Sequence, residues 1–264
     1  MATPLLLVVH GRTGGVIPEV YQQLARELEQ RRQAPVGLTA LTAPPPEPGA
    51  GAGDRRLTLV PLLLLPGNHA RVDVPALARQ LQATAGAARL AAGEAFDPAD
   101  AGAGGGPGSG ASKADLGVDS ARGQSCGVAA GDRLRRLPFL GAWPAWQRAL
   151  AAELAALADP AASGEGSAAR PPLLLHHPLE SRLAPRYLEY LQRRLGCRCL
   201  AAPYSSQHSA ALALAIDGPV LPLALAANRL TERLEPQLGR LQAAPLLERP
   251  RLRQLLVDQL AALP

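Results

Sequence analysis

Two histidines, His10 and His69, each follow a run of apolar residues that has the composition of a strand. His10 ends the run Leu5-Leu-Leu-Val-Val9, which is typical of a strand buried on both faces. His69 follows the run from Leu57 to Leu65 and the turn Pro66-Gly67-Asn68. In an open α/β sheet, ligands bind outside the carboxyl ends of the strands, where two such imidazoles would meet. The pair could hold a divalent metal such as Fe(II), Co(II), Ni(II) or Zn(II), or act as bases near neutral pH.

Each of these histidines also has a structural interpretation, as a polar strand end that hydrogen-bonds the backbone. The pair favours a functional site, because both histidines lie in the same context, within two residues of a glycine. Asp73 likewise has two interpretations. We expect it to be the N-cap of the helix that begins Val74-Pro75, and the alternative is a carboxylate that orients His69.

The elements that must position these residues alternate between strands and helices. The pattern predicts a strand at 5–9, a helix from Pro18 with Val20, Leu24 and Leu28 at spacing four, a strand at 36–41, a strand at 57–65, and a helix with Val74, Leu77 and Leu81 on one face. This order is typical of a parallel α/β sheet.

The middle of the chain differs in composition. Residues 86–131 offer no sustained hydrophobic period and 102–110 are mostly glycine, which predicts a disordered insertion. Order returns at Leu134, with a helix to about Ala158, and a Pro/Gly/Ser-rich linker follows at 159–171.

The second half then repeats the pattern of the first. The run Pro172-Leu-Leu-Leu-His176-His177 resembles the first strand and its histidine, and 220–228 resembles 60–68. Between and after these lie further predicted elements: a helix with Leu183, Tyr187, Leu191 and Leu195 at spacing four, a strand at 197–203, and helices at 229–241 and 251–263. We therefore predict two similar α/β halves, the second without a counterpart of His69.

The composition excludes several classes of protein. Charged residues make up 19% of 264 residues and the net charge is +5, which excludes a highly charged disordered chain. All basic residues except Lys113 are arginines, a bias typical of a GC-rich genome, and they are dispersed along the chain. A nucleic-acid-binding protein would concentrate that charge, so we expect no nucleic-acid partner. The apolar runs are too short for a membrane helix.

The three cysteines cannot all pair, which favours a reducing compartment, and the first residues lack the basic region of a secretory signal. We therefore expect a soluble cytoplasmic protein. Since both halves lie on one chain, we also expect a monomer.

The segments LLLVVHG and VPLLLLPGNHARVDVP resemble the sirohydrochlorin chelatases, the class II tetrapyrrole chelatases of siroheme and cobalamin synthesis. The signature of that family is a strand ending in His-Gly-Ser, followed further on by Pro-Gly-x-His-x-x-x-Asp-[Ile/Val]-Pro. The second motif matches at Pro66–Pro75. The first matches at His10 and Gly11, with Arg12 in place of the usual serine. The resemblance extends over residues 4 to about 82 and is weak over 172–241.

This resemblance implies an α/β fold of two pseudo-symmetric chelatase-like domains, each a mostly parallel sheet flanked by helices, with a cleft between them. The N-terminal domain would comprise 1–85 and the helix at 134–158, and the C-terminal, degenerate domain would comprise 172–264. The histidine pair would lie in the N-terminal domain.

By the same resemblance, His10 and His69 would hold the metal and accept the pyrrole protons that it displaces. Sirohydrochlorin carries many carboxylates, so Gly11, Arg12 and Arg71 are the expected substrate-binding residues. The metal is substrate, Fe²⁺ or Co²⁺ with Ni²⁺ left open, and we expect no further cofactor.

The remaining candidates favour structural roles. His176 and His177 are interpreted as a decayed repeat or as residues lining the cleft, and His208 as a polar residue at a helix start or a neighbour of the cleft. Cys197 and Cys199 share one face of a strand but lack further ligands for zinc. The match to Gly-x-Ser-x-Gly at 123–127 lies in the low-complexity insertion and is interpreted as chance.

Three hypotheses follow. The favoured one is a chelatase that inserts Fe²⁺ or Co²⁺ into sirohydrochlorin. The second is a non-catalytic carrier of a tetrapyrrole or a metal, derived from a chelatase and suggested by Arg12 and the degenerate second half. The third, an unrelated α/β hydrolase, needs a serine on a strand-to-helix turn, which the sequence does not offer.

Overall fold

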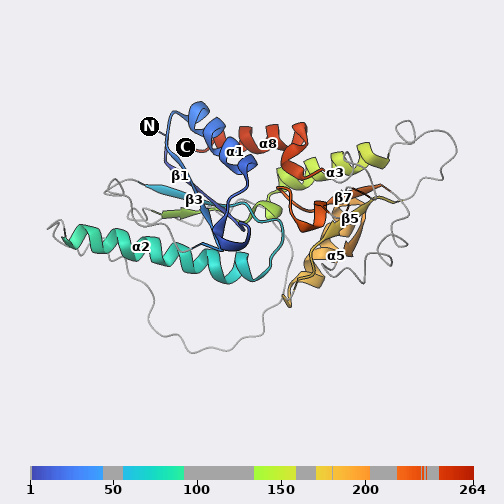
Figure 1. Ribbon diagram of the computed structural model, residues 1–264, viewed down its shortest axis with the longest axis horizontal. Helices are drawn as coiled ribbons and strands as arrows, with labels where there is room; N and C mark the ends of the chain where they lie inside the picture. The colour runs from blue at the N-terminus through green and yellow to red at the C-terminus, as the bar shows by residue number, and fades with distance from the viewer. Residues whose placement is uncertain are drawn as a thin grey trace.

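The computed structural model describes residues 2–43, 56–91, 134–158, 171–179, 181–202, 219–232, 234, 236 and 244–264. These residues form two parallel sheets with helices packed against them (Figure 1), so the predicted α/β class is confirmed.

The first sheet contains four parallel strands in the order β2-β1-β3-β4. The strands are β1 (Leu5–Val9), β2 (Val36–Ala40), β3 (Leu57–Pro61) and β4 (Leu134–Arg136). All of β1 is buried, as its continuous apolar run predicts for a central strand. The third strand ends at Pro61 rather than at the predicted residue 65. Proline has no N–H to donate to a neighbouring strand, and β4 pairs with β3 only as far as Leu59.

The second sheet repeats this arrangement with three parallel strands in the order β6-β5-β7. They are β5 (Leu173–His176), β6 (Arg198–Ala201) and β7 (Val220–Pro222). In both sheets the first strand is central and pairs with the next two strands along the chain. The prediction of two similar halves is therefore confirmed at the level of sheet topology.

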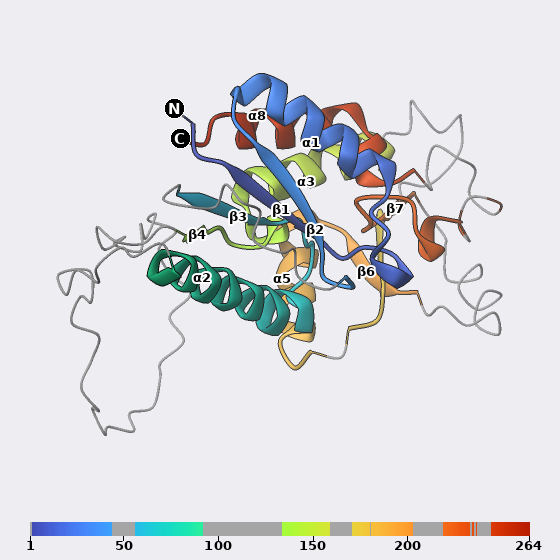
Figure 2. The same ribbon diagram turned by 60° about the vertical axis from the view of Figure 1, so that its left-hand side comes forward.

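Among the described residues, the helices that cover these sheets are α1 (Glu19–Arg32), α2 (Val74–Ala91), α3 (Pro144–Ala158), α5 (Ala184–Leu195) and α8 (Pro250–Ala261). Figures 1 and 2 show α1 and α8 side by side on one side of the first sheet and α2 on the other. The buried residues agree, because Leu5 and Leu7 contribute to one apolar cluster, whereas Leu6 and Val8 pack with α2 residues such as Leu77 in another.

The largest apolar cluster is shared by the two halves. It contains residues of β1 and β5 together with residues of α1, α3, α5 and α8. The assignment of the helix at 134–158 to the N-terminal domain stays a prediction. In the structure α3 packs against α5, α8 and β7, and α8 returns from the end of the chain to pack against α1. Each half thus supplies a helix to a layer that both sheets share.

One buried arginine fixes the end of α1 to the residues around α8. Arg32 is 7% exposed, and its guanidinium donates to Thr3 O at 2.6 Å and to Leu260 O and Leu263 O at 2.7 Å each. Burial lowers the pKa of Arg32 from its usual value. The guanidinium therefore provides charged donors for backbone carbonyl groups at this packed junction.

Some predicted boundaries shift. The helix α2 continues to Ala91, past the predicted start of the insertion at residue 86, and residues 92–133 of that prediction lie outside the described residues. The linker predicted at 159–171 falls outside them up to residue 170. Within the described ranges, no helix combines the length and apolar character needed to cross a membrane.

Candidate active site

The first candidate, His10, lies immediately after β1, as predicted. Its ring Nδ1 donates to the backbone oxygen of Gly11 at 2.8 Å. A carbonyl only accepts, so Nδ1 carries a proton and Nε2 of the neutral ring keeps its lone pair. The side chain is exposed. His10 is therefore a strand-end imidazole with a free nitrogen ligand.

The loop that carries His10 is shaped by Gly11 and Thr42. Gly11 has a φ of 78°, and a Cβ added there would lie 2.6 Å from Thr42 Oγ1 and 2.7 Å from Ala40 Cβ. The Thr42 hydroxyl lies 3.1 Å from His10 O and 3.0 Å from Arg12 O, so its one proton is shared between two carbonyls. Thr42 was not among the predicted residues, because a threonine directly after a predicted strand carries no signal of its own. Gly11 is thus required by backbone geometry and by space.

The second candidate, His69, begins a π-helical turn, His69–Asp73, that leads into α2. It does not lie directly at the strand end, since β3 stops at Pro61. The predicted N-cap role of Asp73 is wrong, because helical dihedral angles extend back to Asn68 and Asp73 lies inside the turn. His69 Nδ1 instead donates to Asp73 Oδ2 at 2.6 Å. The alternative interpretation, a carboxylate hydrogen-bonded to His69, describes the contact that forms.

The two imidazoles lie against each other. Their ring centroids are 4.5 Å apart and the planes are nearly perpendicular, at 85°. The carboxylate of Asp73 fixes the proton of His69 on Nδ1, just as the Gly11 carbonyl does for His10, so both rings keep an Nε2 lone pair. Within the described residues no third His, Cys, Asp or Glu joins them to form a metal-binding group. The arrangement therefore offers two nitrogen ligands and leaves further coordination positions to other molecules.

Two arginines were expected to bind substrate, and they lie in different surroundings. The Arg12 guanidinium donates to Ala227 O at 3.0 Å and to Glu232 Oε1 at 3.1 Å, both in the second half. Arg71 belongs to the turn that carries His69, on the exposed surface. Arg12 thus connects the His10 loop to the segment after β7.

The loops at the carboxyl ends of the two sheets also approach each other near Gly67. A Cβ added at Gly67 would lie 3.5 Å from Leu179 Cδ2, which follows β5. These contacts bring the histidine loops opposite the second half, where the resemblance places a cleft. The cleft itself stays a prediction.

The strand register shows which histidine of the second half corresponds to His10. In the first sheet, the backbone N–H that follows β2 donates to Val9 O at 2.9 Å. In the second sheet, the N–H that follows β6 donates to His176 O at 2.8 Å. His176 therefore corresponds to Val9, and the exposed His177 corresponds to His10. His176 is buried, and desolvation lowers its pKa. This effect exceeds that of the hydrogen bond to His177 O, which raises the pKa. His208 lies outside the described residues.

Cys197 and Cys199 lie at the start of β6, away from this site. Cys197 is buried beside α5, where its thiol and that of Cys199 interact. The hydrogen bond with Cys197 and burial both raise the pKa of the Cys199 thiol. A raised pKa disfavours the reactive thiolate form. The Gly-x-Ser-x-Gly match at 123–127 lies outside the described residues.

Comparison with known proteins adds independent findings. The sequence profile of the CbiX family matches residues 4–101. No curated protein sequence matches the chain. One solved structure, CbiX, the terminal enzyme for biosynthesis of siroheme in denitrifying bacteria, shares 18% identity over 99% of this chain and 100% of its own, with a TM-score of 0.53. A second, SirB from Bacillus subtilis with Fe³⁺, shares 14% identity over 99% of this chain and 96% of its own, with a TM-score of 0.52.

The resemblance drawn from the sequence motifs is confirmed by these matches. The family match contains both His10 and His69, and the structural likeness extends over the second half, where the sequence resemblance is weak. At this level of identity the structural likeness concerns the fold. Residues 4–101 therefore match the model of the CbiX family, and the chain as a whole is similar in fold to CbiX and SirB.

Proposed function

We propose that the chain is a metal chelatase that inserts Fe²⁺ or Co²⁺ into sirohydrochlorin, in siroheme or cobalamin biosynthesis. The observation that carries this proposal is the edge-to-face pair of imidazoles, His10 and His69, each with Nδ1 hydrogen-bonded and Nε2 free. Neutral imidazole nitrogens suit borderline divalent metals. The family match over the segment that contains the pair supports the same assignment.

The spacing of the rings suits a shared metal ion. With ring centroids 4.5 Å apart, the two imidazoles are close enough for one ion to be bound by a nitrogen of each ring, since metal–imidazole bonds measure about 2.0–2.1 Å. Two protein ligands leave further coordination positions for water or for pyrrole nitrogens.

The chain's own residues would act in two ways during insertion. His10 and His69 would deliver the ion to the macrocycle, and their Nε2 atoms, released from the metal, would accept the two pyrrole protons that it displaces. Asp73 would keep the His69 ring in one tautomer and orientation, as carboxylates do beside metal-binding histidines. Two ligands hold an ion less firmly than a closed four-ligand site, which suits a metal that must leave.

The substrate's carboxylates require cationic or N–H partners. We infer that Arg71, on the turn that carries His69, and the backbone around Gly11 bind them, and that Arg12 does so after exchanging its Glu232 partner for a substrate carboxylate. The Arg12–Glu232 pair is about half exposed on both sides, so solvent screening keeps it weak and exchange is feasible.

The same contact favours the second hypothesis, a carrier of a tetrapyrrole or a metal. Arg12 replaces the serine of the family motif and connects the His10 loop to Ala227 and Glu232. A loop connected to the other half in this way suits a site that retains its ligand. Binding without turnover would distinguish the carrier from the chelatase.

The test is an anaerobic assay with purified protein, metal-free sirohydrochlorin, and Fe²⁺ or Co²⁺ added separately, followed by the macrocycle absorbance against buffer alone. His10→Ala and His69→Ala should abolish the acceleration. His177→Ala is the matched control, because it removes the structurally equivalent, exposed histidine of the second half. Pigment binding without faster insertion would select the carrier, and the faster metal would indicate the pathway. A cytoplasmic monomer without a further cofactor stays part of this proposal.

A further inference from the structure

A pocket of about 500 Å³ lies between α2 and β4. Its apolar surface comes from Pro75 and Ala78 on α2 and from Leu134 on β4. Neither His10 nor His69 lines it, and α2 covers the face of the first sheet that points away from the shared helical layer. A volume of this size suits a small molecule, since ligand pockets commonly measure about 300–1,000 Å³.

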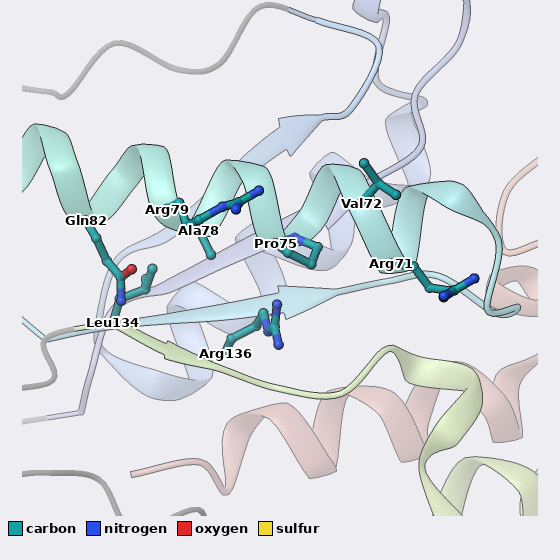
Figure 3. A pocket seen from close by; sticks show the side chains of 8 residues that line it. All are labelled: Arg71, Val72, Pro75, Ala78, Arg79, Gln82, Leu134 and Arg136. Carbon is teal, nitrogen blue, oxygen red and sulfur yellow. The ribbon is translucent and has the colours of Figure 1, made fainter. Parts of the chain in front are cut away.

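Three arginines surround this pocket. Figure 3 shows Arg71 at one end of it, Arg79 on the α2 side, and Arg136 rising from β4 toward α2. Among the residues that the structure describes, no acidic side chain lines the pocket and none of the three arginines makes an ion pair. Three like charges around one concavity create a local positive potential that attracts anions.

The arginines indicate which chemical groups the ligand carries. The guanidinium group presents a planar fork of donors that matches the paired oxygens of a carboxylate or phosphate. The apolar surface between the arginines accommodates a nonpolar body. The side chains that line the pocket project from regular elements of the fold. Val72 lies in the turn His69–Asp73, Pro75 in α2, and Leu134 and Arg136 in β4.

We propose that this pocket is a second binding site, for a small molecule with an apolar body and two or more carboxylate or phosphate groups. The site is independent of the metal, because it contains neither histidine. It shares the turn His69–Asp73 with the candidate active site through Arg71, so an occupant would contact the element that carries His69.

The experiment measures anion binding to the full chain by calorimetry, without metal or tetrapyrrole. The probes are benzene-1,3,5-tricarboxylate, which has an apolar ring, and inorganic pyrophosphate. We expect at least one probe to bind with a Kd of about 1 mM or lower in about 50 mM KCl, and more weakly in about 300 mM KCl. Tighter binding of one probe identifies carboxylate or phosphate as the preferred group.

The variant Arg79→Gln/Arg136→Gln should raise the Kd about tenfold or more, since both lost guanidiniums face the bound anion. Arg186→Gln is the matched control, an exposed helix arginine outside the pocket, and should change the Kd less than about twofold. The single variant Arg136→Lys keeps the charge and should show an intermediate loss. The proposal is overturned if neither probe binds or if the double variant binds as tightly as the wild type. It is also overturned if Arg186→Gln loses as much affinity as the double variant, because that result would indicate nonspecific attraction to a chain of net charge +5.

Discussion

Replacing Asp73 with asparagine tests how the site controls His69. The native carboxylate accepts from His69 Nδ1 at 2.6 Å and can only accept, so it requires the proton on Nδ1. An asparagine amide has both a donor and an acceptor, and its NH₂ group can donate to Nδ1 instead. That arrangement moves the ring proton to Nε2 and removes the lone pair that would bind the metal.

The size of the effect follows from the geometry. Loss of a carboxylate behind a metal-binding histidine reduces activity or metal affinity by about 10–100-fold, or about 1.4–2.8 kcal/mol. The side chains of His69 and Asp73 are 42% and 44% exposed, so water competes for this hydrogen bond. We therefore expect Asp73→Asn to lower the rate of metal insertion about tenfold, at the lower end of that range.

Two measurements check this expectation. The rate of insertion reports the function, and long-range proton–nitrogen NMR of the imidazole nitrogens reports the tautomer of His69 directly. Asp258→Asn is the control, because Asp258 is an aspartate of similar exposure that pairs with Arg31, away from the site. An unchanged tautomer together with a wild-type rate in Asp73→Asn would refute the reasoning, as would an equal loss in Asp258→Asn.

Three further predictions concern stability. Gly11→Ala should lower the free energy of unfolding by about 2–4 kcal/mol in urea titrations, through the left-handed φ of 78° and the crowding of its Cβ. Gly14→Ala, with a φ of 79° and no neighbour within 4 Å, should lose only about 1–2 kcal/mol; equal losses would contradict the crowding argument. Arg32→Met should lower the free energy of unfolding by about 3 kcal/mol, measured from the urea midpoint, since three carbonyls lose a charged donor. A change below about 1 kcal/mol would show that water replaces the guanidinium. Burial lowers the pKa of His176, so the unfolded chain binds more protons than the folded chain at this histidine. The wild type should therefore lose stability as the pH falls below about 6.5. His176→Asn should lose less stability over the same pH range, as measured by urea unfolding at each pH.

Local composition was sufficient to predict most strands and the histidine pair. A run of five consecutive apolar residues, such as β1, has few stable placements other than a strand covered on both faces. The strand β4 was missed, because Leu134-Arg-Arg136 is short, polar and at the sheet edge, where one face needs no apolar residues. The sequence predicts Asp73 to be an N-cap, because an acidic residue before Val-Pro is a common helix start. The wide turn that begins at His69 leaves no sequence signal of this kind.

The sequence by itself determined the parallel α/β class, the repetition of the two halves, and the family motif around His10 and His69. Only the tertiary structure decided which elements meet. A periodic apolar face shows that α3 or α8 is buried, but it does not show against which partner, and both sheets offer similar apolar faces. The equivalence of His177 with His10 depends on the strand register within each sheet. The partners of Arg12, Ala227 and Glu232, are 215 and 220 residues away along the chain. Such contacts form only when the two halves pack, because their physical cause is complementarity in space and not order along the chain.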